Sequence, residues 1–148
     1  MKKEIERKFL VTGDDYKKLV VEKYHILQGY LNKNPKLTVR IRLKNQEGWL
    51  TIKGKSNASG TTRLEWEVPI PTKVARSLLK LATGNPIEKI RHIIPHGGLT
   101  IEVDEFLGHK KGLILAEIEL PEENTSFVKP HWFGNEVTGN PEYYNAMM

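Results

Sequence analysis

The sequence predicts a single α+β domain of eight antiparallel strands and two or three short helices. Eight segments are strand-like, and all but the one at 25–31 alternate charged and apolar residues with the period of two that strands require. Two others repeat apolar residues at helical spacing, and no segment has the composition of a linker. A chain of 148 residues buries about 70% of its unfolded surface, so we expect one domain over residues 1–148.

The first predicted strand covers residues 4–11, where charged side chains alternate with apolar ones. A turn at 12–15 then caps an amphipathic helix that is expected to reach Lys23. The second strand follows at 25–31, and the turn at 32–35 ends it because it contains asparagine and proline.

The strictest alternation in the chain predicts a strand at residues 37–44, followed by another at 49–53. Residues 54–62 are rich in serine, glycine and asparagine and are predicted to form a mobile loop. The strand at 63–68 repeats the charged pattern of the opening strand and ends at Pro69.

A second amphipathic helix is predicted over residues 72–83, with Gly84 at its C-terminal end. The last three predicted strands cover residues 89–94, 100–106 and 114–120. Asn140-Pro141-Glu142 combines a cap residue, a proline and an acid, which predicts a final helix. Trp66 and Trp132 are expected in the core.

One face of each predicted strand except the one at 25–31 is almost wholly ionic. Its acids are Glu4, Glu6, Glu65, Glu67, Glu102, Asp104, Glu117 and Glu119, and its bases are Lys8, Arg40, Arg42, Lys53, Lys55, Arg63, Lys89 and Arg91. The opposite faces are apolar and must receive the helices. The charged faces therefore either point to water from an open sheet or line the interior of a closed barrel.

Closure is the better interpretation, because solvent-exposed faces usually mix uncharged polar residues with charged ones. About eight strands leave an interior that holds side chains or one small ligand. Burying so many charges costs several kcal/mol per ion unless they are paired or solvated. A charged interior is therefore reasonable only if it receives an ionic ligand.

Composition favours an anionic partner and a cytoplasmic location. The formal net charge is +5, but no run of like charges suggests a tail that coats nucleic acid. There is no cysteine, and no segment has the features of a signal peptide or a membrane span. We expect no nucleic-acid or membrane partner, and the sequence leaves monomer and homodimer open.

An ordered set of motifs resembles the CYTH family, the triphosphate tunnel metalloenzymes. The matching segments are residues 4–8 (EIERK), 28–31 (QGYL), 39–42 (VRIR), 51–54 (TIKG), 63–67 (RLEWE), 102–104 (EVD), 116–119 (AEIE) and 132–143. The resemblance implies an eight-stranded antiparallel tunnel with a charged interior and helices packed outside. It also implies hydrolysis of triphosphate compounds with Mg²⁺ or Mn²⁺, and some members cyclise ATP.

The charged residues divide by chemistry. Carboxylates are hard ligands for Mg²⁺ and Mn²⁺, which makes the eight acids candidate metal ligands, with Glu4 and Glu6 as first choice and Glu117 or Glu119 beside them. Arginine forks and lysine ammonium groups suit phosphate oxygens. The candidate substrate-binding residues are Lys8, Arg40, Arg42, Lys53, Arg63, Lys89 and Arg91.

The favoured function is a metal-dependent phosphoric anhydride hydrolase that acts on inorganic tripolyphosphate through an activated water. A class IV-type adenylate cyclase and a thiamine or nucleoside triphosphatase remain alternatives, although no aromatic cluster is set aside for a base. A non-catalytic polyphosphate-binding module is a third, but such a module gains nothing from the acids.

Lys8 and Tyr30 are the candidate catalytic pair. Lys8 lies on the charged face of the first strand and Tyr30 belongs to the next strand, so the two could meet across a strand pair. An ammonium beside a phenol favours the phenolate, which could take a proton from water. The alternative is that Lys8 binds phosphate while Tyr30 packs.

Overall fold

A computed structural model describes all residues, 1–148, and contains nine strands, one α-helix and four 3₁₀ turns. The strands are β1 (Lys2–Val11), β2 (Glu22–Asn32), β3 (Leu37–Lys44), β4 (Glu47–Gly54), β5 (Thr62–Ile70), β6 (Thr83–His96), β7 (Leu99–Phe106), β8 (Ile114–Glu119) and β9 (Phe133–Glu136). The helix and turns are α1 (Thr72–Leu79), η1 (Asp15–Leu19), η2 (Gly108–Lys110), η3 (Pro141–Tyr143) and η4 (Asn145–Met147).

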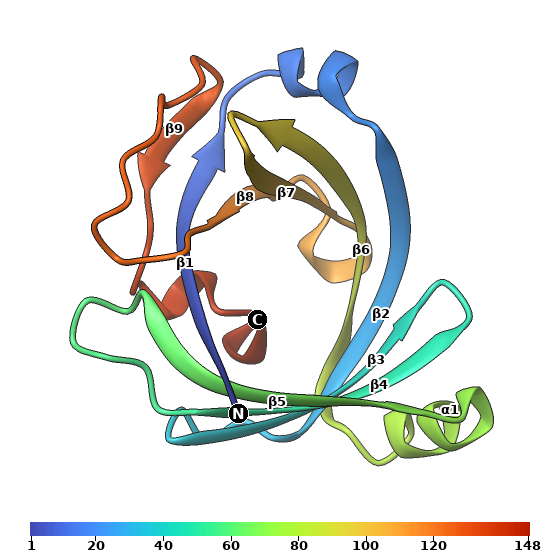
Figure 1. Ribbon diagram of the computed structural model, residues 1–148. Helices are drawn as coiled ribbons and strands as arrows, with labels where there is room; N and C mark the ends of the chain where they lie inside the picture. The colour runs from blue at the N-terminus through green and yellow to red at the C-terminus, as the bar shows by residue number, and fades with distance from the viewer.

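Strands β1 to β8 close into the predicted antiparallel barrel (Figure 1). The order around the ring is β5-β4-β3-β2-β6-β7-β8-β1, and β1 returns to β5. The closing pair is short and runs from Lys2 opposite Glu65 to Ile5 opposite Thr62. Beyond it, the second half of β1 pairs with β8 on one side and with the added strand β9 on the other. β1 and β2 therefore lie on opposite sides of the ring.

The apolar core lies outside the barrel. The largest cluster includes Ile5, Phe9 and Val103 from the outer faces of β1 and β7, covered by Tyr16 of η1 and by Trp132. A second cluster lies where α1 covers the outer faces of β3 and β4 (Figure 1). None of the helices is long and apolar enough to span a membrane.

Several predicted elements are wrong in length or type. The expected helix up to Lys23 is only the 3₁₀ turn η1, because Val20 is already extended and β2 begins at Glu22. α1 ends at Leu79, four residues earlier than predicted, and the expected C-terminal helix is the pair of turns η3 and η4. Asn140 nevertheless caps η3 as predicted, since its side chain accepts a hydrogen bond from the Glu142 amide.

One further expectation, a buried Trp66, fails on the side of the barrel that contains β5. Trp66 is 45% exposed, because the short helix α1 leaves this part of the outer face uncovered, whereas Trp132 is buried as expected. The segment predicted as a mobile loop, residues 54–62, makes side-chain contacts with Glu123. Its Thr61 and Thr62 hydroxyl groups and the Asn57 amide donate to one Glu123 carboxylate oxygen.

Candidate active site

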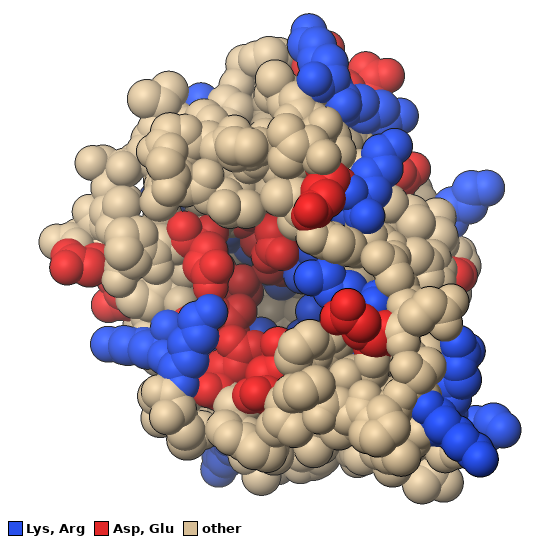
Figure 2. Space-filling model, turned by 45° about the vertical axis from the view of Figure 1, so that its right-hand side comes forward, with Lys and Arg blue, Asp and Glu red and all other residues tan.

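The bore of the barrel is a cavity of about 450 Å³, and only 6 of its 33 lining residues are hydrophobic. Pockets for small molecules are usually 300–1,000 Å³ and mainly apolar, so this one has an ordinary size and an unusual lining. Strand alternation produces it, because every second side chain of β1, β3, β4, β5, β6 and β8 points inward and most of these inward side chains are charged. In Figure 2, acids gather on the left of the opening, and bases lie within it on the right and at its left edge.

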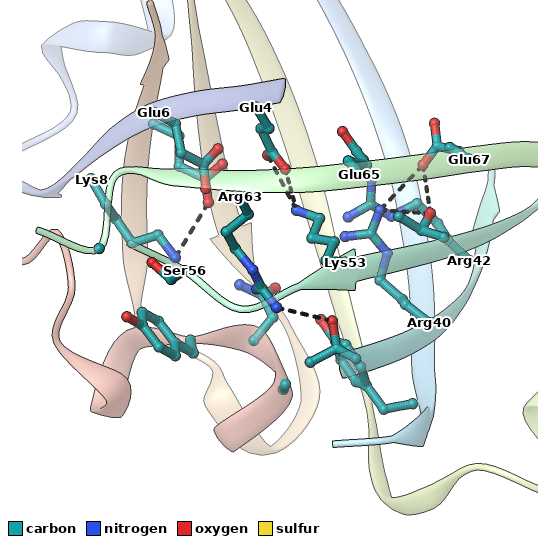
Figure 3. Close-up of a pocket in the computed structure, with 18 of the residues that line it drawn as sticks. Glu4, Glu6, Lys8, Arg40, Arg42, Lys53, Ser56, Arg63, Glu65 and Glu67 are labelled. Carbon is teal, nitrogen blue, oxygen red and sulfur yellow. Dashed lines mark hydrogen bonds and ion pairs between the residues drawn. The ribbon is translucent and has the colours of Figure 1, made fainter. Parts of the chain in front are cut away.

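One wall of the bore is acidic. Glu4 and Glu6 lie on β1 and Glu117 lies on the neighbouring strand β8, opposite Lys8 in the register. Figure 3 shows Glu4 and Glu6 pointing from β1 into the cavity. Burial, followed by the charges of Glu117 and Glu4, raises the pKa of Glu6 well above its ordinary value. The Glu6 carboxyl group therefore holds its proton to a higher pH than an ordinary glutamate, and a bound cation would displace that proton.

The two neighbours of Glu6 stay ionised because cations offset their burial. Burial alone would raise the pKa of Glu4, but the Lys53 ammonium group outweighs it and lowers the pKa. Glu117 behaves in the same way: the charges of Lys8 and Arg91 outweigh burial and lower its pKa to about 2. The acidic wall thus combines two carboxylates of lowered pKa, Glu4 and Glu117, with one carboxyl group of raised pKa, Glu6.

The acidic wall fits a divalent metal by donor chemistry and charge. Oε2 of Glu4 is buried without a hydrogen bond, although the Lys53 ammonium group lies 2.8 Å away. No three His, Asp or Glu side chains are already assembled around one point. Mg²⁺ commonly binds through one or two carboxylates together with substrate phosphates and waters, so a complete protein cage is not required.

The opposite wall is basic and is built from β3 and β6. Arg40 donates to Thr51 and Glu67, at 3.1 and 3.4 Å. Arg42 contacts no acid: its Nε and Nη2 donate to Oε1 of Gln28, at 2.9 and 2.7 Å. Burial, together with the charges of Arg40 and Arg91, lowers the pKa of Arg42 to about 9. The repulsion among these three guanidinium groups marks a place where they would stabilise a bound anion.

Arg63 on β5 resembles Arg42 in having only uncharged partners. Its Nε donates to the Gly54 carbonyl oxygen at 2.8 Å, and its Nη2 donates to the Thr38 hydroxyl at 3.3 Å (Figure 3). Lys53 differs, because its ammonium group lies 2.8 Å from Glu4. Arg42 and Arg63 are therefore the arginines of the bore whose charge is not neutralised by a neighbouring acid.

The predicted ligand Asp104 is an exception among the acids, since it does not line the cavity. It is 2% exposed and lies 2.7 Å from the Lys89 ammonium group and 2.8 Å from Nε of Arg91. These two cations hold the pKa of Asp104 well below its usual range against the effect of burial. Its lone pairs are already used, so we assign Asp104 to the support of Lys89 and Arg91.

Lys8 and Tyr30 both line the bore, but they face each other across it. The notion that they meet across a strand pair is wrong, because β1 and β2 are not neighbours. The Lys8 ammonium group donates to the Tyr143 carbonyl oxygen at 3.0 Å and lies 3.5 Å from Glu117. Burial lowers the pKa of Lys8, but the charges of Glu117 and Glu6 outweigh it and raise the pKa overall. Lys8 is therefore a cation and not a base.

The structure brings nearly all of the predicted residues together. The predicted acids that line the cavity are Glu4, Glu6, Glu65, Glu67, Glu102, Glu117 and Glu119, and the predicted bases are Lys8, Arg40, Arg42, Lys53, Lys55, Arg63, Lys89 and Arg91. The sequence interpretation assigned no role to Gln28 or Asn145. Gln28 follows the same alternation as Tyr30 and could have been found in that way. No local sequence pattern indicates that Asn145, in the C-terminal turns, reaches the bore.

Replacing Glu6 by glutamine should stabilise the metal-free protein at neutral pH. The folded protein keeps the Glu6 proton where the unfolded chain has released it, so the free energy of unfolding falls as the pH rises above about 4.5. Glu6→Gln removes this loss. We expect thermal unfolding in chelator at pH 7.5 to shift upward by about 3 °C or more, and the difference should vanish near pH 4. An equal or lower midpoint at pH 7.5 would contradict the protonated state of Glu6.

Comparisons with known proteins agree with this geometry. The inorganic triphosphatase of Acetivibrio thermocellus is 48% identical over 147 residues, which cover 99% of this chain and 92% of the relative. The inorganic triphosphatase of Nitrosomonas europaea is 36% identical and covers 98% of this chain and 95% of its own. A crystal structure of an inorganic triphosphatase superposes with a TM-score of 0.68 at 32% identity, covering 97% of this chain and 95% of its own.

The sequence model of the CYTH domain matches residues 2–145, which is nearly the whole chain. Most of the motifs that suggested the resemblance lie on strands of the barrel, among them β1, β3 and β8, whose inner faces contribute to the two charged walls. The protein therefore belongs to the CYTH domain family.

Proposed function

We propose that this protein hydrolyses inorganic tripolyphosphate with Mg²⁺ or Mn²⁺ as its cofactor. The observation that carries the proposal is the division of the bore into an acidic wall on β1 and β8 and a basic wall on β3 and β6. A metal-triphosphate complex has cations and anions on different atoms, so a bore with separated charges matches it. The low share of hydrophobic lining residues favours an inorganic substrate over a nucleotide.

In this proposal, Glu4, Glu6 and Glu117 hold the metal. When bound, the metal supplies positive charge that offsets the charge of the phosphate oxygens. Arg40, Arg42, Arg63, Lys53, Lys89, Arg91 and Lys8 bind those oxygens. Phosphoryl transfer requires mainly positioning and neutralisation of charge, together with an aligned water.

The function is tested by incubating the protein and Mg²⁺ separately with tripolyphosphate, ATP and thiamine triphosphate. We expect the fastest phosphate release from tripolyphosphate and none in the presence of a chelator. Glu6→Gln protein purified in parallel controls for contaminating phosphatases. Faster release from ATP or thiamine triphosphate, or formation of cyclic AMP, would contradict the proposal.

We also propose that Tyr30 accepts the proton of the attacking water, with Lys8 as the nearby cation. The Tyr30 side chain is 7% exposed, and its hydroxyl receives a hydrogen bond from Gln28 at 3.4 Å. Tyr30→Phe should lower kcat about tenfold and remove the rise of kcat on the alkaline side, because the charged walls remain intact. A pH-rate profile of the variant that matched the wild type would leave Tyr30 as a packing residue and Lys8 as a phosphate ligand.

A further inference from the structure

The C-terminal turns reach the bore, and Asn145 makes specific contacts there. Figure 1 shows the C-terminal segment within the outline of the ring, and Tyr144 to Met147 line the cavity. Oδ1 of Asn145 accepts hydrogen bonds from Nε2 of Gln28 at 3.1 Å and from the Lys89 ammonium group at 2.8 Å. Gln28 is fully buried and Lys89 is 1% exposed, so these contacts lie beneath the surface of the wall.

The chemistry of the side chains determines the direction of each hydrogen bond that links Arg42, Gln28, Asn145 and Lys89. Arginine and lysine can only donate, so Gln28 must turn its carbonyl oxygen toward Arg42 and Asn145 must turn its carbonyl oxygen toward Lys89. The amide nitrogen of Gln28 then points to Asn145. The result is a continuous link from Arg42 through Gln28 and Asn145 to Lys89, which crosses the adjacent strands β3, β2 and β6.

We infer that Asn145 and Gln28 are positioning residues that aim Arg42 and Lys89 at the phosphate groups of the substrate, an inference that rests on the proposed function. Gln28 occupies Nε and Nη2 of Arg42 and thereby fixes the plane of the guanidinium group. Lys89 has three donors, of which Asp104 and Asn145 occupy one each. The third donor and the remaining edge of Arg42 are left for the bore.

For Arg42, an uncharged acceptor suits this task better than an acid does. Lys53 and Arg91, which pair with Glu4 and Asp104, have much of their charge neutralised. An amide oxygen holds a cation in place without cancelling its charge, so Arg42 keeps its full attraction for an anion. The amide also helps to space Arg42 from Lys89, two cations that would otherwise repel each other.

An experiment can distinguish this positioning role from the opposite one, in which Asn145 blocks Lys89. If Asn145 occupied Lys89 in competition with phosphate, its removal would tighten substrate binding. The positions of its partners favour positioning, because Asn145 contacts Lys89 and the buried Gln28 at the same time, and Gln28 itself contacts Arg42. Displacing Asn145 would therefore release Arg42 as well as Lys89.

The test measures KM and kcat for tripolyphosphate with Mg²⁺, and calorimetric binding of tripolyphosphate without a divalent ion, in four variants. These are Asn145→Ala, Gln28→Met, their double variant, and the control Glu142→Gln. Methionine keeps the volume of Gln28 and removes its hydrogen bonds. Glu142 lies in η3 on the same C-terminal segment, is exposed, and has no side-chain partner. Thermal unfolding checks that each variant is folded.

Each single variant should raise KM about tenfold and weaken metal-free binding in parallel, while kcat stays within about threefold of the wild type. The double variant should raise KM by less than the product of the single effects, because both residues act on the same arginine. Glu142→Gln should leave KM unchanged.

An unchanged KM in Asn145→Ala would overturn the inference, and so would a lower KM or single effects that multiply in the double variant. If Gln28→Met does not fold, Asn145→Asp replaces it in the test. The aspartate carboxylate still accepts a hydrogen bond from Lys89, but it neutralises the charge of Lys89. We therefore expect KM to rise at least as much as in Asn145→Ala. A wild-type level of KM in Asn145→Asp would also overturn the inference. Absence of turnover and binding in the wild type would instead overturn the proposed function.

Discussion

Glu6→Gln should lower kcat for tripolyphosphate by about a thousandfold at saturating Mg²⁺. Glu6 stands between Glu4 and Glu117 on the acidic wall, and all three carboxyl groups are close enough to shift the pKa values of one another. Glutamine keeps the shape of the side chain but cannot supply the negative charge that a divalent ion requires. Because phosphoryl transfer depends mainly on charge neutralisation, the loss should fall on kcat.

The control for this variant is Glu88→Gln. Glu88 lies on β6 outside the bore, where its carboxylate contacts His25 on the surface. Glu88→Gln makes the same replacement of a carboxyl group by an amide, but at a site remote from the acidic wall, and turnover should stay close to that of the wild type. If Glu6→Gln kept kcat within a few-fold of the wild type, the assignment of the metal to this wall would be wrong.

Arg42→Ala should raise KM for tripolyphosphate by about a hundredfold. Arg42 lines the basic wall, contacts no acid, and is held by two hydrogen bonds to Gln28, so its charge is available to phosphate. Charge-assisted contacts from a guanidinium group are about twice as strong as neutral ones, and its planar fork adds specificity that lysine lacks. Arg42→Lys should therefore recover only part of the loss.

Arg76→Ala is the matched control for Arg42→Ala. Arg76 lies on the exposed side of α1, where it donates to Gln46, and its removal changes the net charge by the same amount. KM values measured at two salt concentrations separate local from general charge effects, since long-range attraction is screened by salt and a buried contact is screened much less. Equal KM values in Arg42→Ala and Arg76→Ala would show that Arg42 does not bind the substrate.

Strand alternation made the lining of the bore predictable. Glu4, Glu6, Arg40 and Arg42 point inward because side chains alternate along a strand, which is a local rule that needs no knowledge of neighbours. Closure of the barrel could also be inferred. Each set of strands has a charged side and an apolar side, and only the apolar side could receive the helices, so the charged side had to line the interior. Glu102 and Glu117 follow from the same rule.

Contacts between distant segments were not predictable in the same way. The pairing of β1 with β5, β8 and β9 depends on how the ring closes, and β9 is too short to show an alternation. Asp104 looked like any other inward acid until the structure placed Lys89 and Arg91 beside it. Asn145 reaches Lys89 across 56 residues of sequence, and no local pattern marks such a contact.

Helix lengths were overestimated for a physical reason. Apolar spacing continued past the actual ends of η1 and α1, but β-branched residues at 20–21 and the turn before Thr83 allow the chain to enter long strands instead. Tertiary pairing with the barrel outweighs weak helix propensity over segments of this length. The shorter α1 also explains why Trp66 remains half-exposed.

The most direct test of the two-wall account is a crystal structure of the protein with Mn²⁺ and tripolyphosphate, obtained with the slow variant Tyr30→Phe. Anomalous scattering locates Mn²⁺ independently of the protein atoms. We expect the Mn²⁺ peak beside Glu4, Glu6 and Glu117, with the triphosphate lying between that peak and Arg42 on β3. A peak on any other wall, or a triphosphate that does not contact Arg42, would contradict the account.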